Sequence, residues 1–144
     1  MAKTRKKMGF VQRAIGRVPI SVPKKQSIRC NVVVDTWDFS GRDVWLPPNR
    51  VYELTIDYPL SNPAVIKVRT GERGLGFAGL MTKIVKGYRR VYKQEDTSIE
   101  RAKAKGDFDG ESRWGIWGHN IGDLAIEGID INHEKRKIRL RVGS

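Results

Sequence analysis

A histidine with acidic neighbours is the first candidate for chemistry in this sequence. His119 is followed by Asp123 and Glu127 within residues 114–127. An imidazole titrates near neutral pH and a carboxylate can orient it, so this combination is typical of a general base. The spacing places no nucleophile beside the ring, and neither histidine of the chain belongs to a metal-ligand pattern. We favour the alternative, in which the two tryptophans of this stretch fill the core and its glycines turn the chain.

A glycine-rich motif offers a second possibility. Residues 74–79 spell G-x-G-x-x-G between an expected strand and an expected helix, and Asp96 lies about 20 residues further on, as in a dinucleotide site. Such a site also needs a buried parallel strand after the helix, and residues 96–105 are too polar to form one. The simpler interpretation is a turn with close helix packing. A third is that the amides at the helix start, beside Arg73, accept a backbone phosphate.

Metal chemistry has little basis in this sequence. Asp107, Asp109 and Glu111 surround a glycine and could hold a divalent cation, but the run is too short for an EF-hand loop and is more typical of a solvated turn. The single cysteine, Cys30, can form neither an internal disulfide nor a cysteine-rich zinc site. We therefore expect no metal and no cofactor.

Basic residues are the most unusual feature of the composition. The 28 lysines and arginines exceed the 16 acidic residues by 12. Residues 1–34 hold nine bases and no acid, and residues 71–105 hold nine bases against four acids. Each phosphate that Lys or Arg neutralises releases a condensed counterion, so nucleic acid is the expected partner. An acidic lipid or protein surface would satisfy the same arithmetic, and solubility alone is the plain alternative.

Two segments supply most of the residues that we expect to contact phosphate. One is the amino-terminal arm, and the other is a helix with an apolar stripe and a basic opposite arc. Strand arginines would extend the surface if their strands are neighbours. The predicted nucleic-acid-binding residues are Lys3, Arg5, Lys6, Lys7, Arg13, Arg17, Arg73, Lys83, Lys86, Arg89, Arg90, Lys93, Arg139 and Arg141.

The elements that must position these residues follow from hydrophobic periodicity. Met8, Val11, Ile15 and Val18 share one helical stripe, so a short helix is expected in the arm. Alternation of apolar and polar residues predicts strands, a capping box at Thr97 predicts a second short helix, and a phase shift at Gly128 predicts a β-bulge. The expected strands are 28–34, 52–58, 64–68, 113–118, 124–131 and 138–142, with helices over 77–92 and 97–105. Residues 52–58 and 64–68 are expected to form a hairpin.

The sequence therefore predicts an α+β fold. We expect a mainly antiparallel, twisted sheet of about five to six strands, one basic amphipathic helix, and a short second helix inserted mid-chain. A chain of 144 residues suits one domain, so residues 1–27 are assigned to a basic arm and 28–144 to a single α+β domain. No apolar run approaches the roughly 20 residues that cross a bilayer, and we expect no membrane partner.

Charge and architecture together favour non-enzymatic binding of a nucleic-acid backbone, RNA or DNA, with low sequence specificity. The alternative is a structural or assembly protein, such as a virion, shell or other particle component, whose basic arm contacts neighbouring subunits. An enzyme that uses His119 with Asp123 or Glu127 is a third hypothesis, and we lean against it. The expected location is cytoplasmic, or within an intracellular or viral particle.

Overall fold

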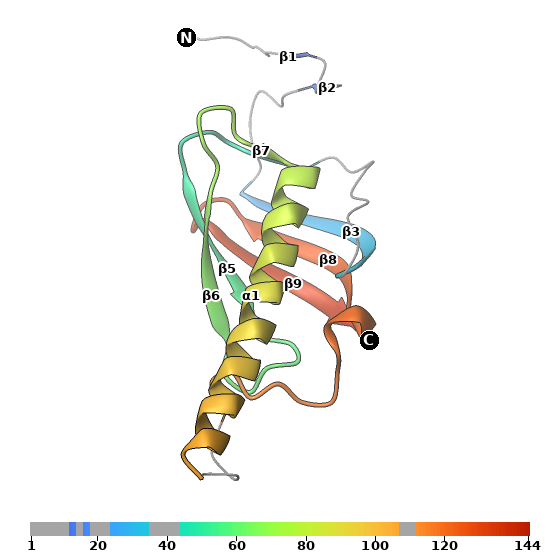
Figure 1. The fold of residues 1–144 in the computed structure, drawn as a ribbon. Coiled ribbons are helices and arrows are strands. Elements are labelled where there is room, and N and C mark those ends of the chain that lie inside the picture. The colour runs from blue at the N-terminus through green and yellow to red at the C-terminus, as the bar shows by residue number, and fades with distance from the viewer. Residues whose placement is uncertain (1–11, 14–15, 18–23, 35–43, 107–111) are drawn as a thin grey trace.

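A five-stranded sheet with one long helix forms the body of the protein (Figure 1). It is a computed structural model that describes residues 12–13, 16–17, 24–34, 44–106 and 112–144. The strand order is β3-β8-β9-β5-β6, with every neighbouring pair antiparallel except β5 and β9. The elements are β3 (Lys25–Val33), β5 (Val51–Ile56), β6 (Ala64–Arg69), α1 (Phe77–Ala104), β8 (Ala125–Asn132) and β9 (Lys137–Gly143). The predicted α+β class and mostly antiparallel sheet are confirmed.

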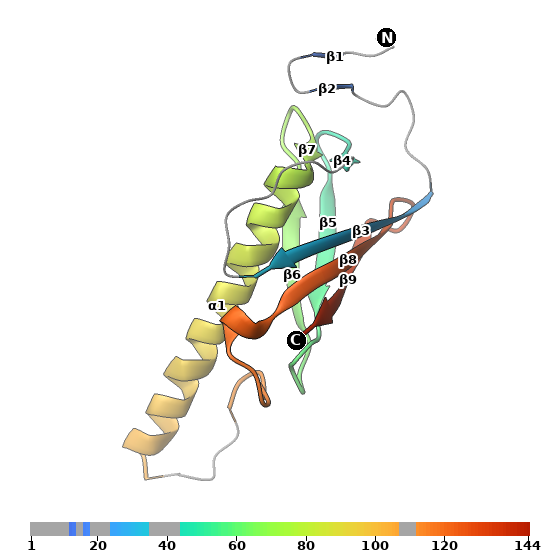
Figure 2. The ribbon, with the colours of Figure 1, turned by 90° about the vertical axis from the view of Figure 1, so that its right-hand side faces the viewer.

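Helix α1 covers one face of the sheet, and the hydrophobic core lies between the two layers (Figure 2). Strand alternation sends every second side chain toward the helix. Leu54, Ile126 and Ile138 from the sheet and Leu80 and Ile84 from the helix are all fully buried. The carboxyl-terminal part of α1 extends past the edge of the sheet (Figures 1 and 2). Among the described helices, none is long and apolar enough to span a membrane.

The predicted hairpin and the predicted bulge are both present. Tyr52 pairs with Val68 and Leu54 with Ile66, which confirms the hairpin. The β8–β9 register shifts between Ile126 and Gly128, which confirms the bulge. A side chain at Gly128 would meet the guanidinium of Arg141 and displace this flexible group.

Short ribbons flank the sheet. Strand β4 (Trp45–Leu46) pairs with β7 (Leu75–Gly76), and η1 (Ile121–Asp123) is a single 3₁₀ turn before β8. In the arm, β1 (Gln12–Arg13) pairs antiparallel with β2 (Gly16–Arg17). The helix expected across residues 8–18 is therefore wrong at these positions. An isolated helix of about ten residues is marginal without packing partners.

Two other predicted elements are also wrong. No second helix begins at Thr97, because α1 continues without a break through Ala104. The Thr97 hydroxyl donates to the Lys93 carbonyl oxygen at 3.0 Å, an interior contact that replaces the expected cap. The strand expected at 113–118 is reduced to one isolated bridge between Leu60 and Ile116.

Candidate nucleic-acid interface

The outward arc of α1 carries the helix cations that the sequence singled out. At 100° per residue the core residues of α1 occupy one side, and Lys83, Lys86, Arg90 and Lys93 fall on the opposite arc. Lys83 is partly exposed and the other three are exposed. Their spacing of three and four residues places them in one row about 15 Å long. That is roughly the axial length of four nucleotides of one strand.

These cations have no acidic neighbour in their own part of the helix. Residues 78–94 contain no Asp or Glu. No ion pair within the described ranges involves Lys83, Lys86, Arg90 or Lys93. Arg89 lies on the same arc and is also exposed. The helix therefore presents a row of four cations, Lys83, Lys86, Arg90 and Lys93, that have no carboxylate partner among the described residues.

Four cations of the sheet, Lys67, Lys137, Arg139 and Arg141, are in the opposite situation. They lie on the face away from α1, because the alternating residues of the same strands are buried beneath the helix. Glu53 bonds Lys67 at 3.0 Å and Lys137 at 3.6 Å, and Arg139 bonds Asp57 at 2.7 Å. The two lysine contacts lower the pKa of Glu53, with the Lys67 hydrogen bond as the largest cause. These cations of the outer sheet face therefore have carboxylate partners.

Arg141 acts within the fold. Its guanidinium donates to the Ile28 carbonyl oxygen and to Ser27 Oγ, both at 3.2 Å, and lies 3.5 Å from Asp130 Oδ2. These contacts tie β9 to β3 across β8. The structure therefore does not bring Arg139 and Arg141 together with the helix arc. Their donors are directed to neighbouring strands.

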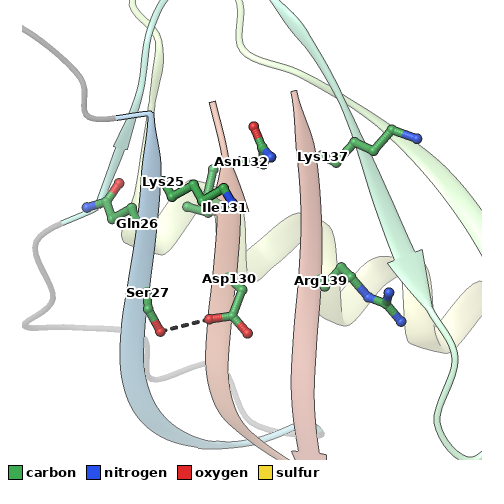
Figure 3. A pocket seen from close by; sticks show the side chains of 8 residues that line it. All are labelled: Lys25, Gln26, Ser27, Asp130, Ile131, Asn132, Lys137 and Arg139. Carbon is green, nitrogen blue, oxygen red and sulfur yellow. Dashed lines mark hydrogen bonds between the residues drawn. The ribbon is translucent and has the colours of Figure 1, made fainter. Parts of the chain in front are cut away.

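A hollow opens on this outer face, over β3, β8 and β9 (Figure 3). It measures about 530 Å³. Asp130 lies within it and accepts a hydrogen bond from Ser27 at 2.7 Å. Two of its cations, Lys137 and Arg139, pair with Glu53 and Asp57. Because the hollow carries its own carboxylate, it suits a polyanion less well than the helix arc. Its lining residues are Lys25, Gln26, Ser27, Asp130, Ile131, Asn132, Lys137 and Arg139.

Other predicted phosphate contacts lie apart from the arc or outside the described residues. Arg73 is exposed in the turn between β6 and β7. Arg13 and Arg17 are described only by the backbone of the β1–β2 ribbon. Lys3, Arg5, Lys6 and Lys7 lie outside the described residues, as do Asp107, Asp109 and Glu111 of the acidic cluster.

The glycine-rich segment serves packing. Gly74 has a φ of 75°, and a side chain there would collide with the Leu46 carbonyl oxygen of β4. At Gly79 a side chain would meet Leu75. Neither strand before α1 pairs with β8, the strand after it: β7 pairs with β4, and β6 is not a neighbour of β8 in the sheet, so the parallel βαβ unit of a dinucleotide site is not formed. These contacts support the turn-and-packing interpretation, and phosphate binding at the helix start stays a prediction.

Glu95 is a structural residue that the sequence analysis missed. Its carboxylate is buried and accepts the backbone N–H groups of Trp114 at 2.8 Å and Ile116 at 2.7 Å. Burial alone raises the pKa of Glu95, but hydrogen bonds from these amides outweigh it and the pKa is lowered. The sequence did contain a signal that Glu95 is buried, because it continues the apolar stripe of Ile84, Tyr88 and Val91. A carboxylate on a buried stripe needs donors, and loop 112–118 supplies them.

His119 belongs to an aromatic cluster and not to an acid–base pair. Its Nε2 shares a 3.1 Å hydrogen bond with the Tyr58 hydroxyl. Asp123 instead accepts the Asn120 N–H at 3.3 Å. In the described part of the chain no carboxylate bonds His119, so the base–carboxylate pair that we considered and did not favour is not formed there. The expectation that both tryptophans fill the core is wrong for Trp117, which is 49% exposed.

The second histidine is a core residue. His133 is buried, shares a 2.8 Å hydrogen bond through Nδ1 with the Tyr52 hydroxyl, and contacts Gln26 Oε1 through Nε2 at 3.0 Å. Burial is the main cause that lowers its pKa, with a contribution from Arg50. No group of three metal-ligating side chains occurs among the residues that the structure describes.

In comparisons with protein-family models, with curated proteins and with solved structures, nothing matches this chain.

Proposed function

We propose that this protein binds the backbone of a nucleic acid, without catalysis and with low sequence specificity, through the outward arc of α1. The arc consists of Lys83, Lys86, Arg89, Arg90 and Lys93. A linear row of cations on a rigid helix suits a linear polyanion, because several phosphates are neutralised at once and their counterions are released together. Binding of this kind follows charge and not base identity, so the sequence preference is weak.

One contrast carries the proposal. Four cations of the outer sheet face pair with Glu53, Asp57 and Asp130, whereas four cations of the helix arc have no carboxylate partner within the described chain. If the basic composition served only solubility, there would be no reason for these two sets of cations to differ. We therefore narrow the interface to α1, with Arg139 and Arg141 excluded. The phosphate contacts expected of Lys3, Arg5, Lys6 and Lys7 stay predictions, and so does the assembly role of the arm.

Two variants with the same loss of charge test the assignment. The helix variant combines Lys83→Gln, Lys86→Gln, Arg90→Gln and Lys93→Gln. The matched sheet variant combines Lys67→Gln, Lys137→Gln, Arg139→Gln and Arg141→Gln. Affinity for a generic oligonucleotide is measured by fluorescence anisotropy across a range of salt concentrations, and circular dichroism establishes that both variants fold.

We expect the helix variant to bind the oligonucleotide more weakly. The slope of the logarithm of the binding constant against the logarithm of the salt concentration should become shallower by about three, because each of the four lost phosphate contacts contributes about 0.7–0.9. The sheet variant should keep both affinity and slope. Equal losses in the two variants would mean that binding follows net charge, and the interface would be wrong. If the wild type binds no oligonucleotide at low salt, the proposed function itself is refuted.

A further inference from the structure

Arg50, at one end of the sheet, has donors without an acceptor. It directly precedes β5 and is partly buried. Its backbone is fixed, because its N–H donates to the Thr70 hydroxyl at 2.9 Å and its carbonyl oxygen accepts the Thr70 N–H at 3.0 Å. Its guanidinium, in contrast, has no hydrogen bond or ion pair with any residue that the structure describes. Polar groups that leave water normally have a partner, so this arginine calls for an acceptor from outside the chain.

A second arginine lies at the same end of the sheet, in the turn between β8 and β9 (Figure 1). The Arg136 carbonyl oxygen accepts the Glu53 N–H at 2.8 Å, which places Arg136 beside Tyr52 across the β5–β9 pair. Arg136 is exposed, and its guanidinium also has no partner among the described residues. Its φ is 56°, and the other non-glycine residue of the described chain with a positive φ is Asn49, directly before Arg50. Side chains disfavour this conformation, and residues held in it concentrate at functional sites.

Both arginine charges act on the same buried pair, Tyr52 and His133. The Tyr52 hydroxyl shares a 2.8 Å hydrogen bond with His133 Nδ1, and both side chains are buried. Burial raises the pKa of Tyr52, and the charges of Arg50 and Arg136 oppose this rise. Burial also lowers the pKa of His133, and the charge of Arg50 lowers it further. The two guanidinium groups therefore share one neighbourhood, around the Tyr52 hydroxyl.

We propose that Arg50 and Arg136 form a binding site for a doubly charged phosphate group. A guanidinium presents parallel N–H donors that match two oxygens of a phosphate. Glu134, the acidic residue of the same turn, is exposed and pairs with neither arginine in the described chain. A carboxylate or a phosphodiester would neutralise one of the two arginine charges, whereas a phosphate monoester carries close to two negative charges at neutral pH. Neither arginine belongs to the helix arc, so this inference does not rest on the proposed function.

The two histidines of the chain provide the readout. A phosphate beside Arg50 favours the imidazolium form of His133, so the pKa of His133 should rise by about 0.5 when inorganic phosphate is added. Titration of the histidine ring protons by NMR measures this rise, with chloride at equal ionic strength as the reference and His133→Gln to assign the signals. The His119 ring bonds Tyr58, beyond the opposite end of β5, and its titration curve should be the same with phosphate and with chloride.

Three variants test the two arginines. Arg50→Gln and Arg136→Gln should each weaken phosphate binding about 10- to 100-fold, because each removes hydrogen bonds to a charged group. Arg136 is exposed, so its variant tests the site even if Arg50→Gln does not fold. Arg69→Gln is the matched control and should bind phosphate like the wild type. Arg69 pairs in register with Val51 and is exposed on the outer sheet face, so the control loses the same charge close to the site.

Two further ligands identify the source of the phosphate. Adenosine 5′-monophosphate should give the same rise in the pKa of His133, and adenosine should give none. Tighter binding of the monophosphate than of inorganic phosphate would assign the site to a nucleotide or a strand end, and equal or weaker binding would assign it to free phosphate. Either result supports the site.

The site is wrong if phosphate leaves the His133 titration unchanged or shifts His119 by the same amount. Equal weakening by Arg50→Gln and Arg69→Gln would also overturn it, because binding would then follow net charge. These outcomes do not affect the helix arc, which the oligonucleotide measurements decide separately.

Discussion

Replacement of Glu95 by alanine should destabilise the protein more than any other single charge removal on α1. The carboxylate is 4% exposed and accepts the amides of Trp114 and Ile116 at 2.8 and 2.7 Å. A hydrogen bond to a charged group contributes about 1.5–3 kcal/mol, and a buried donor left without a partner costs a similar amount. With two such amides on one acceptor, we expect Glu95→Ala to lower the free energy of unfolding by about 3–5 kcal/mol.

Urea denaturation followed by circular dichroism measures this loss, with Asp96→Ala as the control. Asp96 is exposed on the same helix, and its removal should change the free energy of unfolding by less than about 0.5 kcal/mol. Glu95→Gln keeps one carbonyl acceptor and should fall between the two. A loss below about 1 kcal/mol for Glu95→Ala would refute the claim that this carboxylate anchors the loop.

The same variant gives a pH test with a defined sign. The folded-state pKa of Glu95 lies below its usual value of 4.5, because the amide hydrogen bonds outweigh burial. Its ionised form therefore contributes stability that is fully present above that usual value and is lost as pH falls through the folded pKa. The gap between wild type and Glu95→Ala should be constant near neutral pH and should narrow in acid. A gap that widens below the usual pKa would contradict the assignment.

Two further predictions concern the fold. Gly71→Ala should lower the free energy of unfolding by about 1–2 kcal/mol, because of the positive φ alone. Gly74→Ala should lower it by about 1–3 kcal/mol more, because only the side chain at residue 74 meets the Leu46 carbonyl oxygen. Equal losses for the two variants in urea denaturation would contradict this prediction. Burial lowers the pKa of His133 below its usual 6.5, so the free energy of unfolding of the wild type should fall as pH drops through 6.5 and level off below the folded-state pKa. The variant His133→Gln has no titrating group beside Tyr52 and should lose this pH dependence. Equal pH profiles for the two proteins would refute the prediction.

The fold was largely predictable because its strands are half-buried. Alternation along Tyr52, Leu54 and Ile56 indicates one buried face, and the phase shift at Gly128 indicates the bulge. Local signals failed where tertiary contacts decide the structure. Thr97 has the sequence context of a cap, yet the helix continues past it because Glu95 and Ser98 hold loop 112–118 against that turn. No pattern within residues 97–105 contains that information.

The candidate site was predictable in part. The phase of Lys83, Lys86, Arg90 and Lys93 against the apolar stripe follows from helical periodicity alone. Which cations meet carboxylates depends on strand order and register. Arg139 was expected to bind phosphate because it points out of the sheet. It does point outward, but Asp57, which directly follows β5 and lies 82 residues earlier in the chain, is 2.7 Å away. The exposure of Trp117 likewise depends on the packing of a loop without regular structure.

The two basic surfaces also differ in what they cost the fold. On the sheet, Glu53 stands in register between Lys67 and Lys137, so close packing of the strands brings opposite charges together. On α1 the five arc cations form five neighbouring pairs at spacings of three or four, namely 83/86, 86/89, 86/90, 89/93 and 90/93. Like charges at that spacing destabilise a helix by about 0.2–0.5 kcal/mol per pair, or roughly 1–2.5 kcal/mol in all. A bound polyanion would convert this repulsion into attraction, and for that reason we assign the partner to the helix and not to the sheet.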